Sequence, residues 1–410
     1  MFRKLPTIKA IAVRTGVALS VCIVSLEIAP PFSGSAFAEQ PAAVSAAIPQ
    51  VGKGGCYNCH YLDKTKFEKF SRGSQDHHFA AGKGGNEWPA FIANWATNDI
   101  YAYTIGKTIG DPALRKVVPV NESGPTIGKI TPDGKFLITL NSADATAASY
   151  RVDRKGLGLA PADKPIPVGS NPWAIEISAD SRFAFVASLG TETVTVLAIA
   201  PKTGALSLVG TPVKTGGGSW WMAITNNGHY LYVANQRVSR ISGYRIDGQT
   251  GSLTPIPASA MSGREPRAVA VTPDDRFLLV ACSASNDVSS FSIDPDTGVL
   301  TEVDTIAGGN WPWSIAINRS SNSFYVANWV SNDLSIFQIA ADGKLTLTEP
   351  SIPSYGTNPV GVTIGPSGDF LHVLNYGSDS MATFRIDHST GKLLFANSIV
   401  TGAHPKWIAF

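Results

Sequence analysis

The sequence predicts an all-β protein, a seven-bladed β-propeller that follows a short cysteine-bearing segment. A unit of about 46 residues recurs along most of the chain, each unit divides into four short strands, and the two ends of the repeat region supply complementary parts of one unit. Charged residues make up 16% of the chain and hydrophobic residues 44%, which excludes coiled coils and charged disordered tails. The formal net charge of +2 gives no indication of nucleic-acid binding.

Residues 1–38 have the pattern of a secretory signal peptide. A basic start that includes Arg3 and Arg14 precedes a mostly apolar stretch from Thr15 to Ile28, and Ala36 and Ala38 form a small-residue cleavage site. An uncleaved membrane anchor is the alternative, although the apolar run is short and contains Glu27. We therefore expect a periplasmic or secreted protein without a membrane segment after cleavage.

The repeat defines residues 88–410 as the propeller. Spacings of 46 to 48 residues separate the residues that open successive units, which are Ile127, Trp173, Trp221, Arg267, Trp313, Val360 and Lys406. Within each unit, an apolar strand leads through a Pro- or Gly-containing turn to an aromatic and β-branched strand, and two further strands follow.

The last unit is split between the two ends of the repeat region. The stretch from Lys406 to Phe410 holds only a first strand, whereas the residues from Trp88 to Thr126 hold only the other three. Together they make a seventh blade and close the ring, which leaves no open sheet edge and predicts a monomer.

These blades resemble the seven-bladed β-propeller lactonase family, which includes bacterial 6-phosphogluconolactonases and fungal carboxymuconate cycloisomerases. They are also similar to exported propellers with Tyr-Val-x-Asn repeats, here Tyr232 to Asn235 and Tyr325 to Asn328. The resemblance implies a lactonase or cycloisomerase acting on an anionic sugar lactone, with Arg267 at the arginine position of the family pattern. Arg237 lies near it on the same predicted face, and we predict both as catalytic residues that hold the anion. Ala268 stands where the family pattern has histidine, and no carboxylate follows the second strand of that blade.

Tryptophans gather on the face where the first strands begin. A ring of indoles can stack on a planar or sugar-like ligand, and bulky residues at repeated positions can equally serve as spacers between blades. The predicted ligand-binding residues are Trp95, Trp173, Trp221, Trp313, Trp329 and Trp407. Cys282 follows a second strand and is predicted to be a buried free thiol.

Residues 39–87 lie outside the repeat and contain a C-x-x-C-H motif. Cys56, Cys59 and His60 have the spacing of c-type haem attachment, in which two thioethers hold the haem and the histidine binds its iron. The flanking residues resemble the first haem-bearing segment of class I cytochromes c. Because no methionine lies between Glu39 and Trp221, His77 or His78 would supply the second axial ligand. A Cys56–Cys59 disulfide, a cytochrome remnant without haem and a zinc site remain as alternatives.

Three functions follow from these features. The first is an exported haem-bearing propeller that passes electrons to a redox partner protein. The second is the lactonase-type enzyme. The third is a propeller without catalytic activity that presents its Trp-rich face to a small-molecule ligand or a protein.

Overall fold

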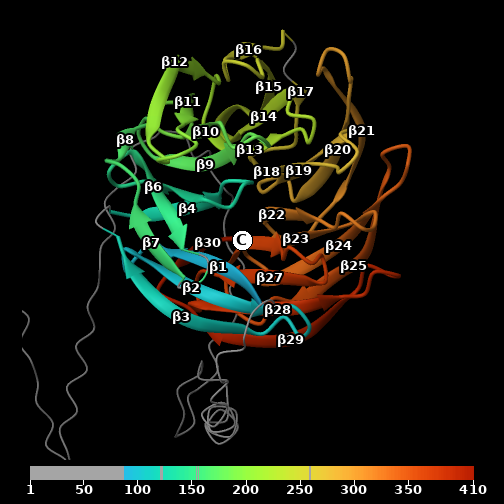
Figure 1. Cartoon of the computed structure of the whole chain (residues 1–410). Helices are drawn as coiled ribbons and strands as arrows, with labels where there is room; N and C mark the ends of the chain where they lie inside the picture. The colour runs from blue at the N-terminus through green and yellow to red at the C-terminus, as the bar shows by residue number, and fades with distance from the viewer. Residues whose placement is uncertain (1–86, 121–122, 154, 156, 258–259) are drawn as a thin grey trace, which may run out of the picture. The chain divides into compact units, whose positions relative to one another are not determined.

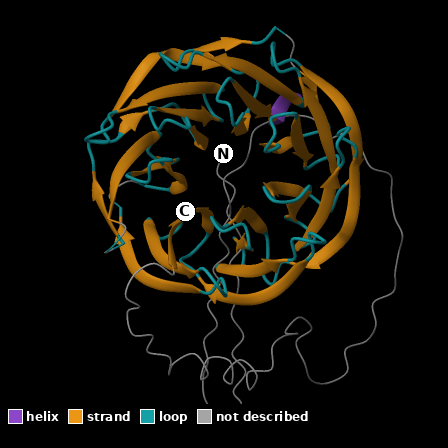
Figure 2. Ribbon diagram, turned by 45° about the vertical axis from the view of Figure 1, so that its right-hand side comes forward, coloured by secondary structure: helices purple, strands orange, loops and turns teal. Residues whose placement is uncertain are grey.

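The computed structural model describes residues 87–120, 123–153, 155, 157–257 and 260–410. Its strands form seven antiparallel sheets arranged as blades around a central axis (Figures 1 and 2). This confirms the predicted all-β fold and the count of seven blades. The helical structure in the described residues is a single 3-10 turn, η1 (Gln236–Val238). No helix in these residues is long and apolar enough to cross a bilayer.

Each blade has four main strands, and the blades are numbered from the first complete one in the chain. Blade 1 holds β4 to β8, blade 2 β9 to β12, blade 3 β13 to β17, blade 4 β18 to β21, blade 5 β22 to β25 and blade 6 β26 to β29. The innermost strands of blades 1 to 7 are β4 (Pro125–Ile130), β9 (Pro172–Ile177), β13 (Ser219–Ile224), β18 (Pro266–Val271), β22 (Pro312–Ile317), β26 (Pro359–Ile364) and β30 (Pro405–Ala409).

The second and third strands lie progressively further from the axis. The second strands are β5 (Phe136–Asn141), β10 (Phe183–Ser188), β14 (Tyr230–Asn235), β19 (Phe277–Cys282), β23 (Ser323–Asn328), β27 (Phe370–Asn375) and β1 (Glu87–Asn94). The third strands are β6 (Thr146–Asp153), β11 (Thr193–Ile199), β15 (Arg240–Ile246), β20 (Asp287–Ile293), β24 (Asp333–Ile339), β28 (Ser380–Ile386) and β2 (Asp99–Gly106).

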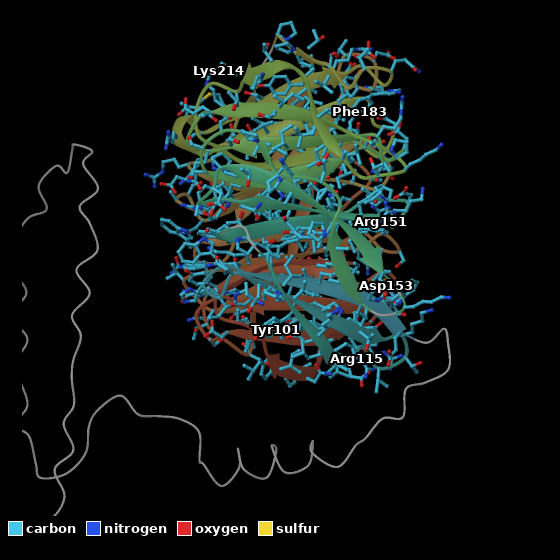
Figure 3. All side chains as sticks on the ribbon, turned by 60° about the vertical axis from the view of Figure 1, so that its left-hand side comes forward. Tyr101, Arg115, Arg151, Asp153, Phe183 and Lys214 are labelled. Atoms are coloured by element: carbon cyan, nitrogen blue, oxygen red, sulfur yellow. The ribbon has the colours of Figure 1, made fainter. Side chains whose placement is uncertain are left out.

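The outer strands are the most exposed to solvent. They are β7 (Gly158–Pro161), β12 (Leu206–Lys214), β16 (Leu253–Pro255), β21 (Leu300–Ala307), β25 (Leu345–Pro353), β29 (Leu393–Val400) and β3 (Pro112–Pro119), with β8 (Ile166–Pro167) and β17 (Ala260–Met261) as additional short pairs. Exposed basic side chains project from them, such as Arg115 of β3 and Lys214 of β12 in Figure 3.

The seventh blade closes the ring as the sequence predicts. Strand β30 pairs antiparallel with β1, with Phe91 opposite Ala409 and Ile92 opposite Ile408. Strands from the two ends of the repeat region therefore share one sheet, in the order β3-β2-β1-β30.

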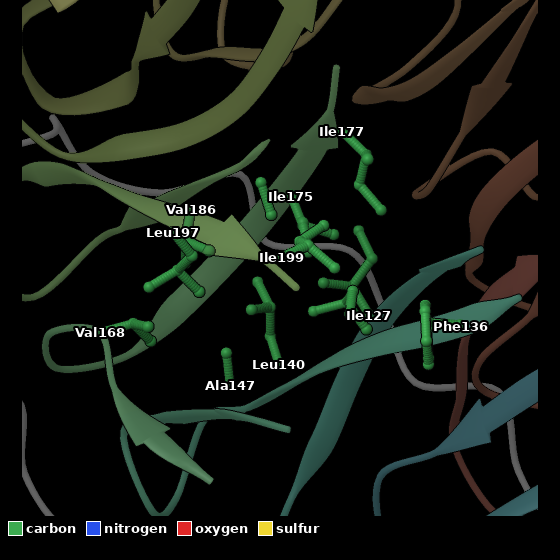
Figure 4. Close-up of a cluster of buried hydrophobic side chains, with 12 residues drawn as sticks. Ile127, Phe136, Leu140, Ala147, Val168, Ile175, Ile177, Val186, Leu197 and Ile199 are labelled. Atoms are coloured by element: carbon green, nitrogen blue, oxygen red, sulfur yellow. The ribbon is translucent and has the colours of Figure 1, made fainter. Parts of the chain in front are cut away.

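The core lies between neighbouring blades, because both faces of each sheet are covered. The second strands β5, β10, β14, β19, β23 and β27 are buried along their whole length, which explains their continuous apolar sequences. Figure 4 shows the core between blades 1 and 2, where Leu140 lies near Ile175 and Val186. Each fully buried side chain of this size contributes about 1.5–3 kcal/mol of transfer free energy. Cys282, at the end of β19, is buried and free, as predicted.

Glycine turns between the third and fourth strands hold adjacent blades together. Gly298 of blade 4 has φ +71°, and its backbone lies against Tyr230 of blade 3, so that an added Cβ would lie 2.5 Å from the ring. Tyr232 donates a hydrogen bond of 2.9 Å to the Gly298 carbonyl. This turn is therefore also a contact between blades.

Candidate functional site

Every inner strand begins with the same irregularity. The strand register shifts by one residue after the first residue of each inner strand, so the second residue forms a bulge. The bulge residues of blades 1 to 7 are Thr126, Trp173, Trp220, Arg267, Trp313, Val360 and Lys406. The residues predicted from the sequence to open each unit are therefore one position too late in two blades, because Ile127 and Trp221 each follow the bulge residue.

The residue before each inner strand has a left-handed backbone in every blade. Glycine or asparagine takes this conformation in four blades, whereas Glu265, Trp311 and His404 take it with φ of 55°, 64° and 55°. A bulky side chain at positive φ is uncommon and persists only where surrounding contacts hold it. The Trp311 N–H donates to Asn286 at 2.8 Å, and the His404 N–H donates to Asp379 at 2.7 Å.

These irregular positions place Arg267 between indole rings. Its guanidinium lies 4.3 Å from the ring centres of both Trp220 and Trp313, and 5.7 Å from that of Trp311. Only 8% of Arg267 is exposed. Its Nη2 donates to Glu265 at 3.1 Å, whereas its Nε has no hydrogen-bond partner among the described residues. Burial lowers the pKa of Arg267, and the Glu265 carboxylate opposes that effect.

Lys406 occupies the same bulge position in blade 7 and also lies among aromatic rings. Its Nζ is 4.3 Å from the ring centre of Tyr376, 5.0 Å from Trp173 and 5.9 Å from Trp95. No carboxylate in the described part of the chain forms an ion pair with it. Burial lowers the pKa of the Lys406 ammonium to about 8. With this pKa, a fraction of Lys406 is the neutral amine near neutral pH, and the amine can accept a proton.

Ring contacts join the two cations into one cluster. The Trp173 and Trp220 ring centres lie 4.7 Å apart, so the indole beside Lys406 touches the indole that covers Arg267. On the other side, Trp329 stacks on Trp313 at 4.7 Å. Tyr376 lies 5.6 Å from Trp329. We call this group the mouth cluster; it comprises Trp95, Trp173, Trp220, Glu265, Arg267, Trp311, Trp313, Trp329, Tyr376, His404 and Lys406.

A tryptophan pair lies directly below the mouth cluster. Trp221 of blade 3 and Trp407 of blade 7 meet across the axis with ring centres 5.1 Å apart. They meet because the equivalent position is small in four other blades, where it holds Ala174, Ala268, Ser314 and Gly361. Both indoles line the upper part of a central cavity that continues toward the opposite face. The pair therefore separates this cavity from the mouth cluster.

The structure brings most of the predicted ligand-binding residues together. Trp95, Trp173, Trp313 and Trp329 belong to the mouth cluster, and Trp221 and Trp407 form the pair below it. Arg237 lies outside the cluster, since its Nη1 contacts Glu192 at 2.8 Å and its side chain is 56% exposed. The predicted haem residues Cys56, Cys59, His60, His77 and His78 lie outside the described residues.

Sequence reasoning missed three of the chemically important members. Lys406 was visible as the residue that opens its unit, where four other units have Trp or Arg. Glu265 directly precedes the strand of Arg267, and Trp220 was hidden beside Trp221. Among the described residues, no group of three His, Cys, Asp or Glu side chains could hold a metal ion. The cluster therefore offers one buried and one partly buried cation, one carboxylate and several ring faces.

Comparison with known proteins supports the fold and defines the family. The family model described as "Lactonase, 7-bladed beta-propeller" matches residues 170–261, 222–313 and 302–410. A 6-phosphogluconolactonase of Pectobacterium atrosepticum is 32% identical over 99 residues, or 24% of this chain and 30% of that protein. One of Yersinia pestis is 30% identical over 108 residues, or 25% of this chain and 30% of that protein.

These sequence matches span only about 30% of the length of those relatives. Structural similarity extends over the whole ring. The periplasmic gluconolactonase of Pseudomonas aeruginosa superimposes with a TM-score of 0.70 at 21% identity, covering 78% of this chain and 98% of that one. At this level of identity, the comparison establishes the shared fold.

Proposed function

The chain belongs to the seven-bladed β-propeller lactonase family, and on that basis we propose that the mouth cluster binds and hydrolyses a sugar-type lactone that carries an anionic group. The substrate class follows from the cations and rings of the cluster. The buried Arg267 and the partly buried Lys406 attract an anion, and flat aromatic faces stack on the apolar face of a sugar ring.

One observation carries the proposal: the mouth cluster contains buried polar atoms without partners. Arg267 Nε, Trp220 Nε1 and His404 Nδ1 have no hydrogen-bond partner among the described residues. Native proteins leave few buried polar groups unpaired, because each costs about 1–3 kcal/mol. Such atoms clustered beside two cations are suited to hold the oxygen atoms of a ligand.

The two cations have different roles in this proposal. Arg267 is held by two indoles and by Glu265, and both its Nε and the N–H of the neighbouring Trp220 lack a partner among the described residues. They bind the anionic group of the substrate and set its orientation. Lys406 has no competing carboxylate and acts on the lactone itself.

Hydrolysis then needs one water molecule and one proton acceptor. The neutral amine of Lys406 takes a proton from water as the water oxygen attacks the acyl carbon. The bond between that carbon and the ring oxygen breaks, and Lys406 returns the proton to the departing alkoxide, which becomes a hydroxyl. The product is a hydroxy acid, whose carboxyl group releases its proton to solvent.

The pKa of Lys406 sets the expected pH dependence. With a pKa of about 8, roughly one amine in ten is neutral at pH 7. The catalysed rate should therefore rise from pH 6 to about pH 8 and level off above it. Arg267 remains protonated throughout this range.

The test is hydrolysis of 6-phosphogluconolactone, with the spontaneous rate subtracted. The structure predicts that Arg267→Gln lowers kcat/KM about 100-fold and that Lys406→Met lowers kcat by a similar factor. Arg182→Gln is the matched control, because Arg182 lies in a turn at the opposite end of blade 2 and pairs with Asp180. Its kcat/KM should stay within twofold of the wild type.

Two outcomes would contradict this function. Wild-type protein that does not exceed the spontaneous rate would exclude hydrolysis of this lactone. If the same protein still binds 6-phosphogluconate and loses that binding in Arg267→Gln, the mouth cluster is a binding site without catalysis. Activity that survives in Arg267→Gln would place the reaction elsewhere.

A second function concerns residues 39–87. We propose that the chain is exported and that Cys56 and Cys59 attach one c-type haem, with His60 as an iron ligand. The leader-like residues 1–38 and the C-x-x-C-H spacing support this proposal. After expression with cytochrome c maturation machinery, we expect a c-type absorption spectrum and the added mass of one haem, both absent in Cys56→Ala/Cys59→Ala. A colourless protein two hydrogens lighter than its reduced mass would indicate a disulfide.

A further inference from the structure

The central cavity on the propeller axis lies below the Trp221–Trp407 pair. Its volume is about 660 Å³, within the range of small-molecule sites. Residues of six inner strands line it, so it is the lower part of the central channel. We call it the lower channel.

The sequence explains why this space is open. Two residues below the Trp221 and Trp407 level, the inner strands carry small side chains in most blades, including Ala223, Ala270 and Ala316. Lys129 and Glu176 are the charged exceptions, and they form an ion pair with each other. Small side chains at this level therefore leave the channel open, and the two charges of Lys129 and Glu176 compensate each other. The indoles of Trp221 and Trp407 close the channel above.

About half of the wall is apolar. Ile127, Ile175 and Val269 are buried around the upper part, and the partly buried Ile315 and Ile317 continue the apolar surface toward the lower opening. The indoles of Trp221 and Trp407 form the upper end. A planar or aliphatic hydrocarbon group would contact apolar atoms on several sides here, which favours its transfer from water.

One cation stands at the lower opening without a partner. The second residue of each lower turn is Pro132, Ala179, Asn226, Pro273, Arg319 or Pro366 in blades 1 to 6, so Arg319 is the charged member of that ring. Within the described residues, Arg319 forms no ion pair or hydrogen bond. Its side chain lines the lower channel and also an adjoining cavity of about 630 Å³.

The adjoining cavity adds a free hydroxyl. It shares Ile315, Ile317, Arg319 and Trp407 with the lower channel, so the two spaces are neighbours. Thr363 lines this second space, and its buried Oγ1 has no hydrogen-bond partner among the described residues. Thr363, with its unpaired hydroxyl, and Arg319, with its unpaired guanidinium, thus line the same adjoining cavity.

From this arrangement we infer that the lower channel is a binding site for an amphipathic organic anion, with its apolar body against the isoleucines and the tryptophan pair and its carboxylate on Arg319. The inference goes beyond the proposed lactonase function and does not depend on it. The Trp221–Trp407 pair lies between the two sites, so each can be tested without the other.

The probe is 2-naphthoate, compared with the neutral 2-naphthalenemethanol, and binding to the full chain is measured by isothermal titration calorimetry. We expect one site for each compound. Arg319→Gln should weaken naphthoate binding at least tenfold and change the binding of the alcohol less than twofold. Arg276→Gln, in the equivalent turn of blade 4, is the matched control and should leave both compounds unaffected.

A second variant tests the location. Ile317→Trp should remove binding of both compounds by filling the channel, and Ala270→Leu serves the same purpose if Ile317→Trp does not fold. The inference is overturned if naphthoate binding is lost in Arg267→Gln and kept in Arg319→Gln, because the anion would then occupy the mouth cluster. It is equally overturned if neither compound binds, or if both bind a channel-filled variant that keeps the wild-type melting temperature.

Discussion

Replacing Lys406 with methionine should make the protein more stable at pH 7. Burial lowers the pKa of the ammonium from an ordinary value of 10.5 to about 8. Each pH unit between the folded and unfolded pKa is worth about 1.4 kcal/mol, so holding the charged form in the folded state costs about 3 kcal/mol. Cation–π contacts with Tyr376 and Trp173 offset about 1–2 kcal/mol of that cost. Methionine has a similar length and no charge, so Lys406→Met should gain about 1–2 kcal/mol.

The sign of the pH dependence is fixed by the same pKa. Because the folded pKa is the lower one, the unfolded chain binds more protons between about pH 8 and 10.5, and the wild type gains stability as pH rises through that window. Below pH 8 both states are protonated, and the cost is constant. The advantage of Lys406→Met should therefore be largest at pH 7 and fall below about 1 kcal/mol at pH 10.

Urea unfolding at pH 7 and pH 10, followed by circular dichroism and tryptophan fluorescence together, measures this difference. Lys344→Met is the control, because the Lys344 side chain is 73% exposed and its removal should change stability little at either pH. A Lys406→Met variant that is less stable than the wild type at pH 7, or that keeps the wild-type pH dependence, would refute the reasoning. A gain in stability together with a loss of hydrolysis is typical of a functional residue.

Three further predictions concern other contacts. Glu265→Gln removes the only ion pair of the buried Arg267 among the described residues, so it should cost about 1–3 kcal/mol in urea unfolding while tightening the binding of 6-phosphogluconate; weaker binding would contradict the assigned role. Trp221→Ala and Trp407→Ala should each cost about 2–3 kcal/mol, and a double-mutant cycle should show coupling of about 0.5–1.5 kcal/mol; strictly additive losses would mean that the rings do not stabilise each other. Gly298→Ala places a Cβ at positive φ against the ring of the preceding blade and should cost at least about 2 kcal/mol in thermal or urea unfolding; an unchanged midpoint would exclude that contact.

The repeat made the fold predictable from the sequence. Turn residues and continuous apolar strands recur in every unit, and the matching ends of the repeat region indicated the shared blade that β1 and β30 form. Local chemistry determines each of these features. The family resemblance carried by the same repeats was also confirmed.

The site was only partly predictable, because it depends on strand register and on contacts between blades. A bulge shifts side chains by one residue, and the adjacent Trp220 and Trp221 are indistinguishable in the sequence, although one covers Arg267 and the other meets Trp407. Arg237 was predicted as a partner of Arg267 and instead contacts Glu192. Arg267 lies at the start of an inner strand, whereas Arg237 follows a second strand, and the sequence carries no signal that only the first position enters the mouth cluster.

The measurement that tests the proposed lactonase site most directly is a crystal structure of the full chain with 6-phosphogluconate, the product of the proposed reaction. We predict the phosphate on Arg267 Nε and the Trp220 N–H, and the carboxylate of the opened lactone within hydrogen-bond distance of Lys406 Nζ. A ligand seated in the lower channel, or an unoccupied mouth cluster at a concentration that saturates binding in solution, would contradict the account.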